Sequence, residues 1–181
     1  SGSKSVVGIL QPYLDDPNHR IRANAAVAIW KYGDFQVSIT LKEMLRDKDS
    51  RQKIAAIYAV GEMKLETFSN ALLPLLNDPD PAIRRNIINA FRKFGKPDLI
   101  KRIIPLLNDQ VDEIRMHVVH ALMDVLKEDG LPFLSERLNV EQSPVVKSLL
   151  ISGIGKIAGP MVGATLFPFL DDPDSRVVGN T

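Results

Sequence analysis

Apolar residues recur along the chain at a spacing that predicts helices rather than strands. After Ile21, the apolar positions Ala25 and Ala28 follow at intervals of four and three residues, so they share one face of a helix. Segments that begin at residues 83 and 114 repeat this arrangement of apolar and polar positions. A strand would instead alternate apolar and polar residues. The pattern therefore predicts a series of related helices.

The helical pattern returns at a fixed period. The segment LDDPNHRIR at 14–22 recurs as LNDPDPAIR at 76–84 and as LNDQVDEIR at 107–115. Its first leucine recurs at intervals of 31, 31, 31, 31 and 32 residues, as Leu14, Leu45, Leu76, Leu107, Leu138 and Leu170. A fixed period of this length is the sequence signature of a repeat architecture.

Each period contains two helical segments, an outer helix before the leucine and an inner helix after it. Proline stands two residues before the leucine in four units, at Pro12, Pro74, Pro105 and Pro168. Because proline lacks an N–H and clashes with the preceding turn, these outer helices are expected to bend near their ends. One column of the inner helices contains only alanine or glycine, at Ala28, Ala59, Ala90, Ala121 and Gly153. This column predicts close packing against another backbone.

A lone pair of helices cannot bury its apolar face, so the pairs are expected to stack. The sequence thus predicts an all-α fold, a right-handed α-solenoid of two-helix repeats with five full repeats and a truncated sixth. We expect a single solenoid over residues 1–181. The expected repeats are approximately 5–33, 34–64, 65–95, 96–126, 127–159 and 160–181. Because the sixth stops where its inner helix should begin, we expect a domain of a larger protein.

The repeats resemble HEAT repeats, particularly the short bacterial form associated with phycobilisome lyases. That form reads approximately L-x-D-P-D-x-x-V-R-x-x-A-A-x-A-L-G-x-I-G, which is similar to 14–33, 76–95 and 146–157. The fifth repeat departs from it, with Val140 at the position of the turn aspartate and one extra residue before Val146. The resemblance implies a protein-binding scaffold, and some members bind nucleic acid. A lyase role ranks last because the chain has no cysteine and no catalytic cluster.

A column of cations begins the inner helices, and a column of aspartates precedes it. The aspartates are typical of a turn that ends one helix and caps the next. The cations could contact phosphates, but we favour a structural role in which each pairs with a turn aspartate of its own or the adjacent repeat. These residues are Asp16, Arg22, Asp47, Lys53, Asp78, Arg84, Asp109, Arg115 and Lys147.

A second set of positions varies between repeats while the packing positions do not. These positions lie three, six and ten residues after the first apolar residue of each inner helix, on one helical face. That face is expected to line the concave surface of the stack and to bind a partner protein or peptide. The predicted partner-binding residues are Asn24, Val27, Lys31, Tyr58, Glu62, Asn86, Asn89, Lys93, His117, His120, Asp124 and Lys156.

Two alternatives arise from clusters of polar residues. His117, His120 and Asp124 could share a helical face as metal ligands, but we disfavour a metal site because no second cluster lies nearby in sequence. Residues 84–102 contain seven cations and one acid, whereas residues 107–145 contain eight acids and three bases. The basic third and fourth repeats could bind phosphate or nucleic acid. The acidic neighbour and the lack of interleaved aromatic residues make this partner less favoured.

Composition narrows the remaining possibilities. The 181 residues are 45% hydrophobic and 25% charged, with a net charge of +1, which is typical of an ordinary folded protein. The absence of cysteine excludes disulfides and thiolate metal sites. No catalytic motif and no cofactor-binding motif is present, so we expect neither catalysis nor a cofactor. No segment has the length of a membrane span, and we expect a cytoplasmic location.

Overall fold

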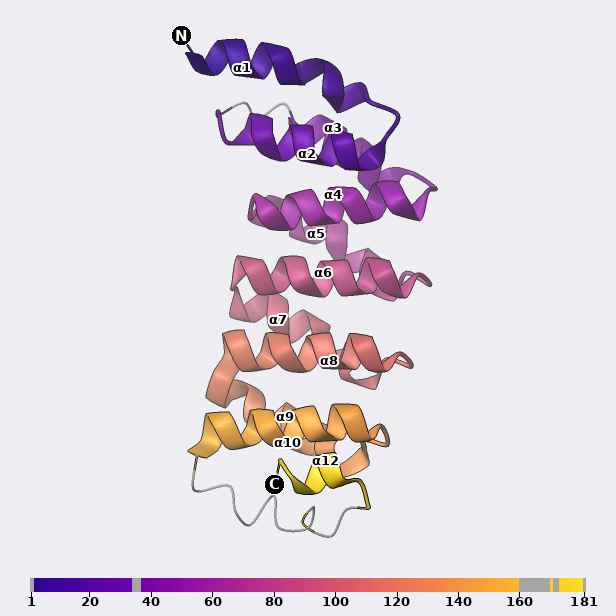
Figure 1. Cartoon of the computed structure of the whole chain (residues 1–181), viewed down its shortest axis with the longest axis vertical. Helices are drawn as coiled ribbons and strands as arrows, with labels where there is room; N and C mark the ends of the chain where they lie inside the picture. The colour runs from indigo at the N-terminus through magenta and orange to yellow at the C-terminus, as the bar shows by residue number, and fades with distance from the viewer. Residues whose placement is uncertain (1, 34–36, 160–169, 171–172, 181) are drawn as a thin grey trace. The chain divides into compact units, whose positions relative to one another are not determined.

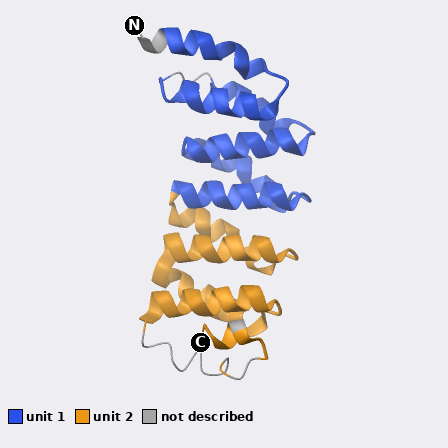
Figure 2. Ribbon diagram, in the orientation of Figure 1, with its two compact units in different colours: residues 1–94 blue, residues 95–181 orange. Residues whose placement is uncertain are grey.

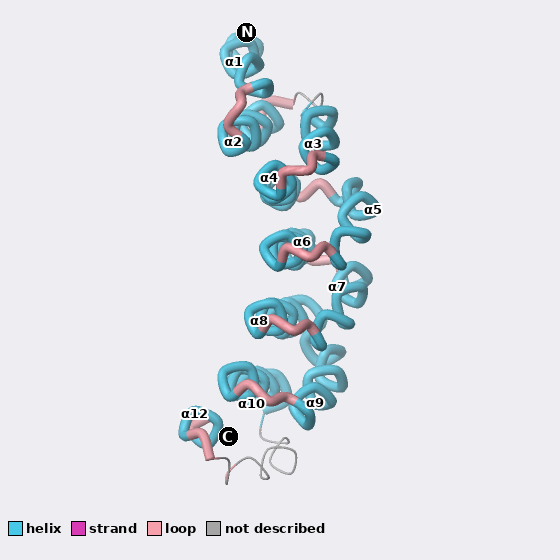
Figure 3. The backbone as a smooth tube through the Cα atoms, turned by 90° about the vertical axis from the view of Figure 1, so that its right-hand side faces the viewer, coloured by secondary structure: helices cyan, strands magenta, loops and turns pink. Residues whose placement is uncertain are grey.

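The computed structural model describes residues 2–33, 37–159, 170 and 173–180, and every regular element in them is a helix (Figure 1). The chain divides into two compact units, unit 1 at residues 1–94 and unit 2 at residues 95–181 (Figure 2). Within each unit, inner and outer helices alternate along the chain and form two layers (Figure 3).

Unit 1 has an inner layer in which α4 packs between α2 and α6. Its outer helices α3 and α5 form the second layer, and α1 packs on α2 (Figure 3). The bounds are α1 (Gly2–Leu10), η1 (Gln11–Asp15), α2 (His19–Trp30), α3 (Val37–Arg46), α4 (Ser50–Glu62), η2 (Glu66–Phe68), α5 (Ser69–Leu72), η3 (Leu73–Asn77) and α6 (Pro81–Phe94). The largest fully buried side chains of this unit include Ile29, Leu41, Ile57 and Phe91.

Unit 2 repeats this arrangement. Its inner helices α8 and α10 pack on each other, and α12 packs on α10. The outer helices α7 and α9 form the other layer (Figure 3). The bounds are α7 (Pro97–Ile103), η4 (Ile104–Asn108), α8 (Asp112–Ala121), η5 (Leu122–Leu126), η6 (Lys127–Gly130), α9 (Leu131–Val140), α10 (Pro144–Ala158) and α12 (Ser175–Val178).

Proline decides how each outer helix ends. At Pro12, Pro74 and Pro105 the α-helix gives way, one residue earlier, to a 3₁₀ helix that holds the proline near its start. The outer helices α3 and α9 have glutamate at this position and remain α-helical through it. The expected change of direction thus takes the form of a tighter helix, which needs no hydrogen bond from the missing N–H. Pro168 lies outside the described residues.

The column of small residues brings inner helices close together. Ala59, Ala90 and Ala121 are buried. A Cβ atom added to Gly61 would lie 3.2 Å from both Cα and Cβ of Ala90, so α4 and α6 approach each other tightly. A Cβ added to Gly153 would meet the flexible end of Met123 at 2.6 Å. Close backbone approach therefore occurs between α4 and α6, whereas the space beside Gly153 is filled by the Met123 side chain.

Each inner segment finishes at a residue with a positive φ angle. Gly33, Gly95 and Gly159 have φ values of 82°, 68° and 61°, a region that glycine enters without steric cost. Lys64 and Lys127 take the corresponding places in the intervening repeats, with φ values of 51° and 50°. The repeat thus requires a positive φ angle at this position even where the residue is a lysine.

Candidate partner-binding groove

Each inner helix of unit 1 begins after a turn in which two side chains, two residues apart, accept hydrogen bonds from backbone N–H groups. Before α4, the Asp47 carboxylate accepts from the Asp49 N–H at 2.8 Å, and the Asp49 carboxylate accepts from the Arg51 N–H at 2.9 Å. The turns before α2 and α6 repeat these bonds with Asp16 and Asn18, and with Asp78 and Asp80. These bonds satisfy N–H groups that the first helical turn leaves free.

The cation column contacts these turns through backbone carbonyls and through a turn carboxylate. Arg22 donates to the Leu14 carbonyl at 3.0 Å, and Lys53 lies 3.2 Å from the carboxylate of Asp78 in the next repeat. In the third repeat this position is Arg84, which donates to the Asp78 carbonyl at 2.8 Å. In the fourth repeat it is Arg115, which donates to the Asp109 carbonyl at 2.8 Å. In the fifth repeat it is Lys147, which lies in α10. One turn carboxylate can serve both purposes, because Asp78 accepts from the Asp80 N–H and also binds Lys53.

Glu141 replaces the aspartate that the fifth repeat lacks. Its carboxylate is fully buried and accepts from the Ser143 N–H at 2.8 Å, the same two-residue reach that the turn aspartates make. Arg115 binds both carboxylate oxygens at 2.9 Å, and Arg137 binds one of them at 2.8 Å. Although burial opposes the charge, the bonds from Arg115, Ser143 and Arg137 lower the pKa of Glu141 to about 2.

Sequence reasoning missed Glu141 although a signal was present. The position of the turn aspartate holds Val140, which is 56% exposed, and the repeat carries one extra residue. A shift of one residue puts Glu141 in the place of the aspartate, and its longer side chain reaches the same N–H. Repeat length and turn chemistry together would have identified it.

A groove of about 670 Å³ lies over the inner helices of unit 1. It extends from the start of α2 across α4 to α6, and Tyr58, which is 48% exposed, is its aromatic residue. The groove is lined by Asn18, His19, Arg20, Ala23, Asn24, Arg51, Ile54, Ala55, Tyr58 and Asn86. Its lining combines apolar surface, side-chain amides and cationic groups.

Three of the predicted partner-binding residues line this groove, namely Asn24, Tyr58 and Asn86. The ammonium of Lys93 lies 5.3 Å from the centre of the Tyr58 ring and forms an ion pair with Glu62. Lys93 and Glu62 therefore brace the aromatic residue from α6 and α4. The Asn86 amide donates to the Ala82 carbonyl at 2.7 Å, which leaves its oxygen as an acceptor. Val27, Lys31 and Asn89 are not part of the lining.

The cationic end of the groove was absent from the predicted set. Arg20 and Arg51 lie four residues before Asn24 and Ala55, on the same face of α2 and α4. Three hydrogen bonds link the Arg51 guanidinium to the Asp49 carboxylate and lower the pKa of that carboxyl. Extending the predicted face by one turn toward the N-terminus would have included both arginines.

The predicted residues of unit 2 lie on α8, η5 and α10. His117 lies 3.8 Å from Glu113, and Asp124 lies in η5, a stretch of π-helix that follows α8. The wider π-helical turn shifts Asp124 from the place that α-helical spacing gives it. Among the described residues, no three histidine or acidic side chains are close enough together to hold a metal ion. His120 lies in the last turn of α8, and Lys156 lies in α10.

The basic segment at 84–102 spans the boundary between the two units. Two of its cations already have partners within unit 1, because Lys93 pairs with Glu62 and Arg84 donates to the turn before α6. These contacts reduce the number of charges available to a phosphate backbone. No described helix has the length and apolar character needed to cross a membrane.

Comparisons with known proteins identify the repeats. The family model described as HEAT repeats matches residues 69–155. Over these residues the chain is similar to HEAT repeats. Outside this segment, the likeness to HEAT repeats rests on the recurring sequence motif, and the phycobilisome-lyase subtype stays a prediction. A search of curated proteins found no match.

The fold also resembles a solved structure. The crystal structure of an engineered protein, a target of the Northeast Structural Genomics Consortium, superposes with a TM-score of 0.60 at 16% sequence identity. The match covers 99% of this chain and 93% of that one. Together with the HEAT repeats, this confirms the predicted class, an all-α solenoid fold. HEAT repeats are generally protein-interaction scaffolds and are typically not enzymes.

Proposed function

We propose that this protein binds a partner protein through the groove over α2, α4 and α6. The observation that carries the proposal is the half-exposed Tyr58 at the groove, flanked by the amides of Asn24 and Asn86. Aromatic residues held in place by neighbours are typical anchors of protein interfaces, because they bury much apolar area at low entropic cost. Side-chain amides can then pair with the backbone of a bound segment.

The charge of the groove indicates which segment fits it. Among the described residues, no acidic side chain lines the groove, whereas His19, Arg20 and Arg51 line it. Arg51 is bound to Asp49, but Arg20 forms no ion pair with any residue that the structure describes. A peptide segment with a carboxylate beside an apolar side chain complements this arrangement. The carboxylate would meet Arg20, and the apolar side chain would pack on Tyr58.

Peptide selection tests this function without a known partner. A displayed peptide library is selected on the immobilised full chain, and the affinity of one enriched peptide is measured by fluorescence anisotropy. We expect Tyr58→Ala to weaken binding by about tenfold or more, as for an interface anchor, and Arg20→Glu to weaken it as well.

Two control variants separate the groove from general effects. Tyr32 is 49% exposed, close to the 48% of Tyr58, and does not line the groove. Arg46 is an exposed cation at the end of α3. Tyr32→Ala and Arg46→Glu should leave the affinity unchanged. Equal losses in groove and control variants would refute the groove, as would no loss in either.

The same protein is then titrated with labelled DNA and RNA at low salt. Because phosphate contacts release counterions, binding that falls steeply as salt rises would favour the alternative of a nucleic-acid partner. We expect no such binding, since two of the seven cations of the basic segment, Arg84 and Lys93, are already engaged.

A further inference from the structure

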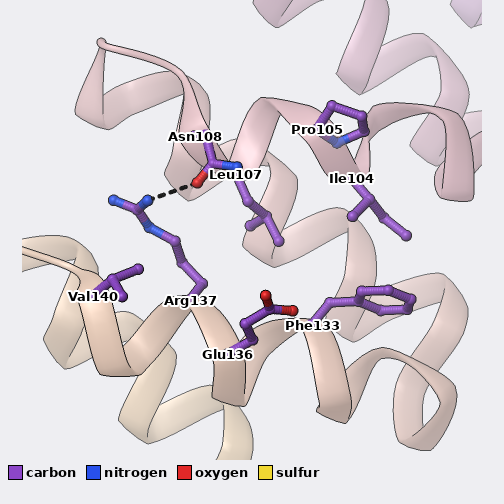
Figure 4. Close-up of a pocket in the computed structure, with 8 residues that line it drawn as sticks. All are labelled: Ile104, Pro105, Leu107, Asn108, Phe133, Glu136, Arg137 and Val140. Carbon is purple, nitrogen blue, oxygen red and sulfur yellow. Dashed lines mark hydrogen bonds between the residues drawn. The ribbon is translucent and has the colours of Figure 1, made fainter.

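The outer face of unit 2 carries a second pocket, separate from the groove of unit 1. It has a volume of about 210 Å³ and lies between η4 and α9 (Figure 4). Its walls are apolar on both sides, with Ile104 and Leu107 from η4 and Phe133 from α9. Pro105, Asn108, Glu136, Arg137 and Val140 complete the lining.

The positive charge at the pocket is already neutralised. Arg137 binds the buried Glu141 at 2.8 Å and also donates to Asn108 at 2.9 Å, the contact drawn in Figure 4. Glu141 binds Arg115 as well, and Arg115 binds Asp112. Two arginines and two carboxylates therefore form a neutral cluster. Arg137 has little charge left for a ligand.

Glu136 is the charge that remains. It is exposed, it lines the pocket, and it forms no ion pair with any described residue. Figure 4 shows its carboxylate rising from α9 toward Leu107, with the Phe133 ring beside it. The repeat offers a comparison, because Glu43 has the same position in unit 1 and there approaches Arg22 at 4.0 Å. The equivalent carboxylate of unit 2 has no such cation.

We propose that this pocket binds a lysine side chain of a partner protein. The four methylene groups of lysine suit the wall of Ile104, Leu107 and Phe133, and long cationic side chains commonly cover apolar surface in this way. The ammonium would then reach the Glu136 carboxylate, and an aromatic ring beside it adds cation–π attraction. This proposal rests on unit 2 alone and is independent of the proposed groove.

Methyl NMR of the full chain tests the proposal with a minimal probe. N-acetyl-lysine methylamide is titrated while the methyl signals of Ile104, Leu107 and Val140 are followed. N-acetyl-norleucine methylamide, which has the same carbon chain and no ammonium, serves as the uncharged probe. We expect the lysine probe to shift these signals and to bind about threefold to tenfold more tightly than the norleucine probe.

Matched variants show whether Glu136 is responsible. Glu136→Gln keeps the shape of the side chain and should reduce lysine binding to the level of the norleucine probe. Glu43→Gln, at the same repeat position in unit 1, should change nothing. Spectra outside the pocket verify that both variants remain folded. Equal binding of the two probes, unchanged binding by Glu136→Gln, or no shift at the pocket methyls would overturn the proposal.

Discussion

Single residues decide two features that the repeat pattern leaves open, the buried carboxylate Glu141 and the left-handed lysine Lys64. Glu141 holds together the turn of the fifth repeat and two arginines from different helices. Lys64 occupies a backbone conformation that suits glycine better. The first residue stabilises its repeat, whereas the second carries a local cost.

Glu141→Gln is expected to lower the free energy of unfolding at neutral pH by about 3 kcal/mol, because it removes the buried carboxylate that pairs with Arg115 and leaves that arginine only the more exposed Asp112. Urea denaturation measures the change. Glu136→Gln, an exposed glutamate on the same helix, should stay within about 0.5 kcal/mol of the wild type. A similar small effect for both variants would contradict the role of the buried cluster.

The same carboxylate predicts an acid dependence. The folded pKa of Glu141, about 2, lies below its ordinary value of 4.5, so its contribution is complete above pH 4.5 and is lost as the pH falls toward 2. The difference corresponds to about 3 kcal/mol. A separate hydrogen bond from the Ser143 side chain lowers the pKa of Asp112, so Glu141→Gln should flatten only part of the dependence of the unfolding free energy on pH. An unchanged slope in this variant would contradict the prediction.

Lys64→Gly is expected to raise the free energy of unfolding by about 0.5–1 kcal/mol. Glycine removes the steric cost of a side chain at φ 51°, although it also adds freedom to the unfolded chain. Lys64→Ala removes the charge but keeps Cβ, so it should bring no gain. If thermal unfolding gave the same stabilisation for both variants, charge rather than backbone conformation would be the cause.

At the scale of the element, the close contact between α4 and α6 limits how large a side chain the small-residue column can hold at position 90. Because the backbone of Gly61 lies against Ala90, Ala90→Val would force two added methyl groups into a closed contact. We expect a loss of about 1–3 kcal/mol. Ala82→Val, on the same helix but only half-buried, should cost about 0.5 kcal/mol. Equal losses in urea denaturation would argue against close packing at Ala90.

Outer helices show how one residue controls an element. The three described outer helices with proline change to a 3₁₀ helix, and the two with glutamate stay α-helical. The position of the change could be predicted from the sequence, because proline always lacks its N–H. The π-helical turn at Leu122–Leu126 could not, since no local residue type requires it.

At the scale of the whole molecule, the prediction of a single solenoid over residues 1–181 is open to experiment. Repeats that depend on their neighbours should unfold together, so Trp30 fluorescence and far-UV circular dichroism should share one urea midpoint. Glu141→Gln, although it lies in unit 2, should then lower the midpoint reported by Trp30 in unit 1. Two separate transitions would indicate that the units fold independently.

The sequence by itself determined the helical repeat, its period and the turns that begin the inner helices. These features depend on local chemistry, such as helical spacing, aspartate caps and proline, which a linear pattern records. Tertiary structure decided which residues meet. In the groove, the predicted Asn24, Tyr58 and Asn86 lie together with Arg20, which was not predicted. The carboxylate of Glu136 keeps no ion pair with a described residue because the neighbouring Arg137 binds Glu141 instead. Contacts between repeats depend on packing in three dimensions, and the spacing along one helix does not contain them.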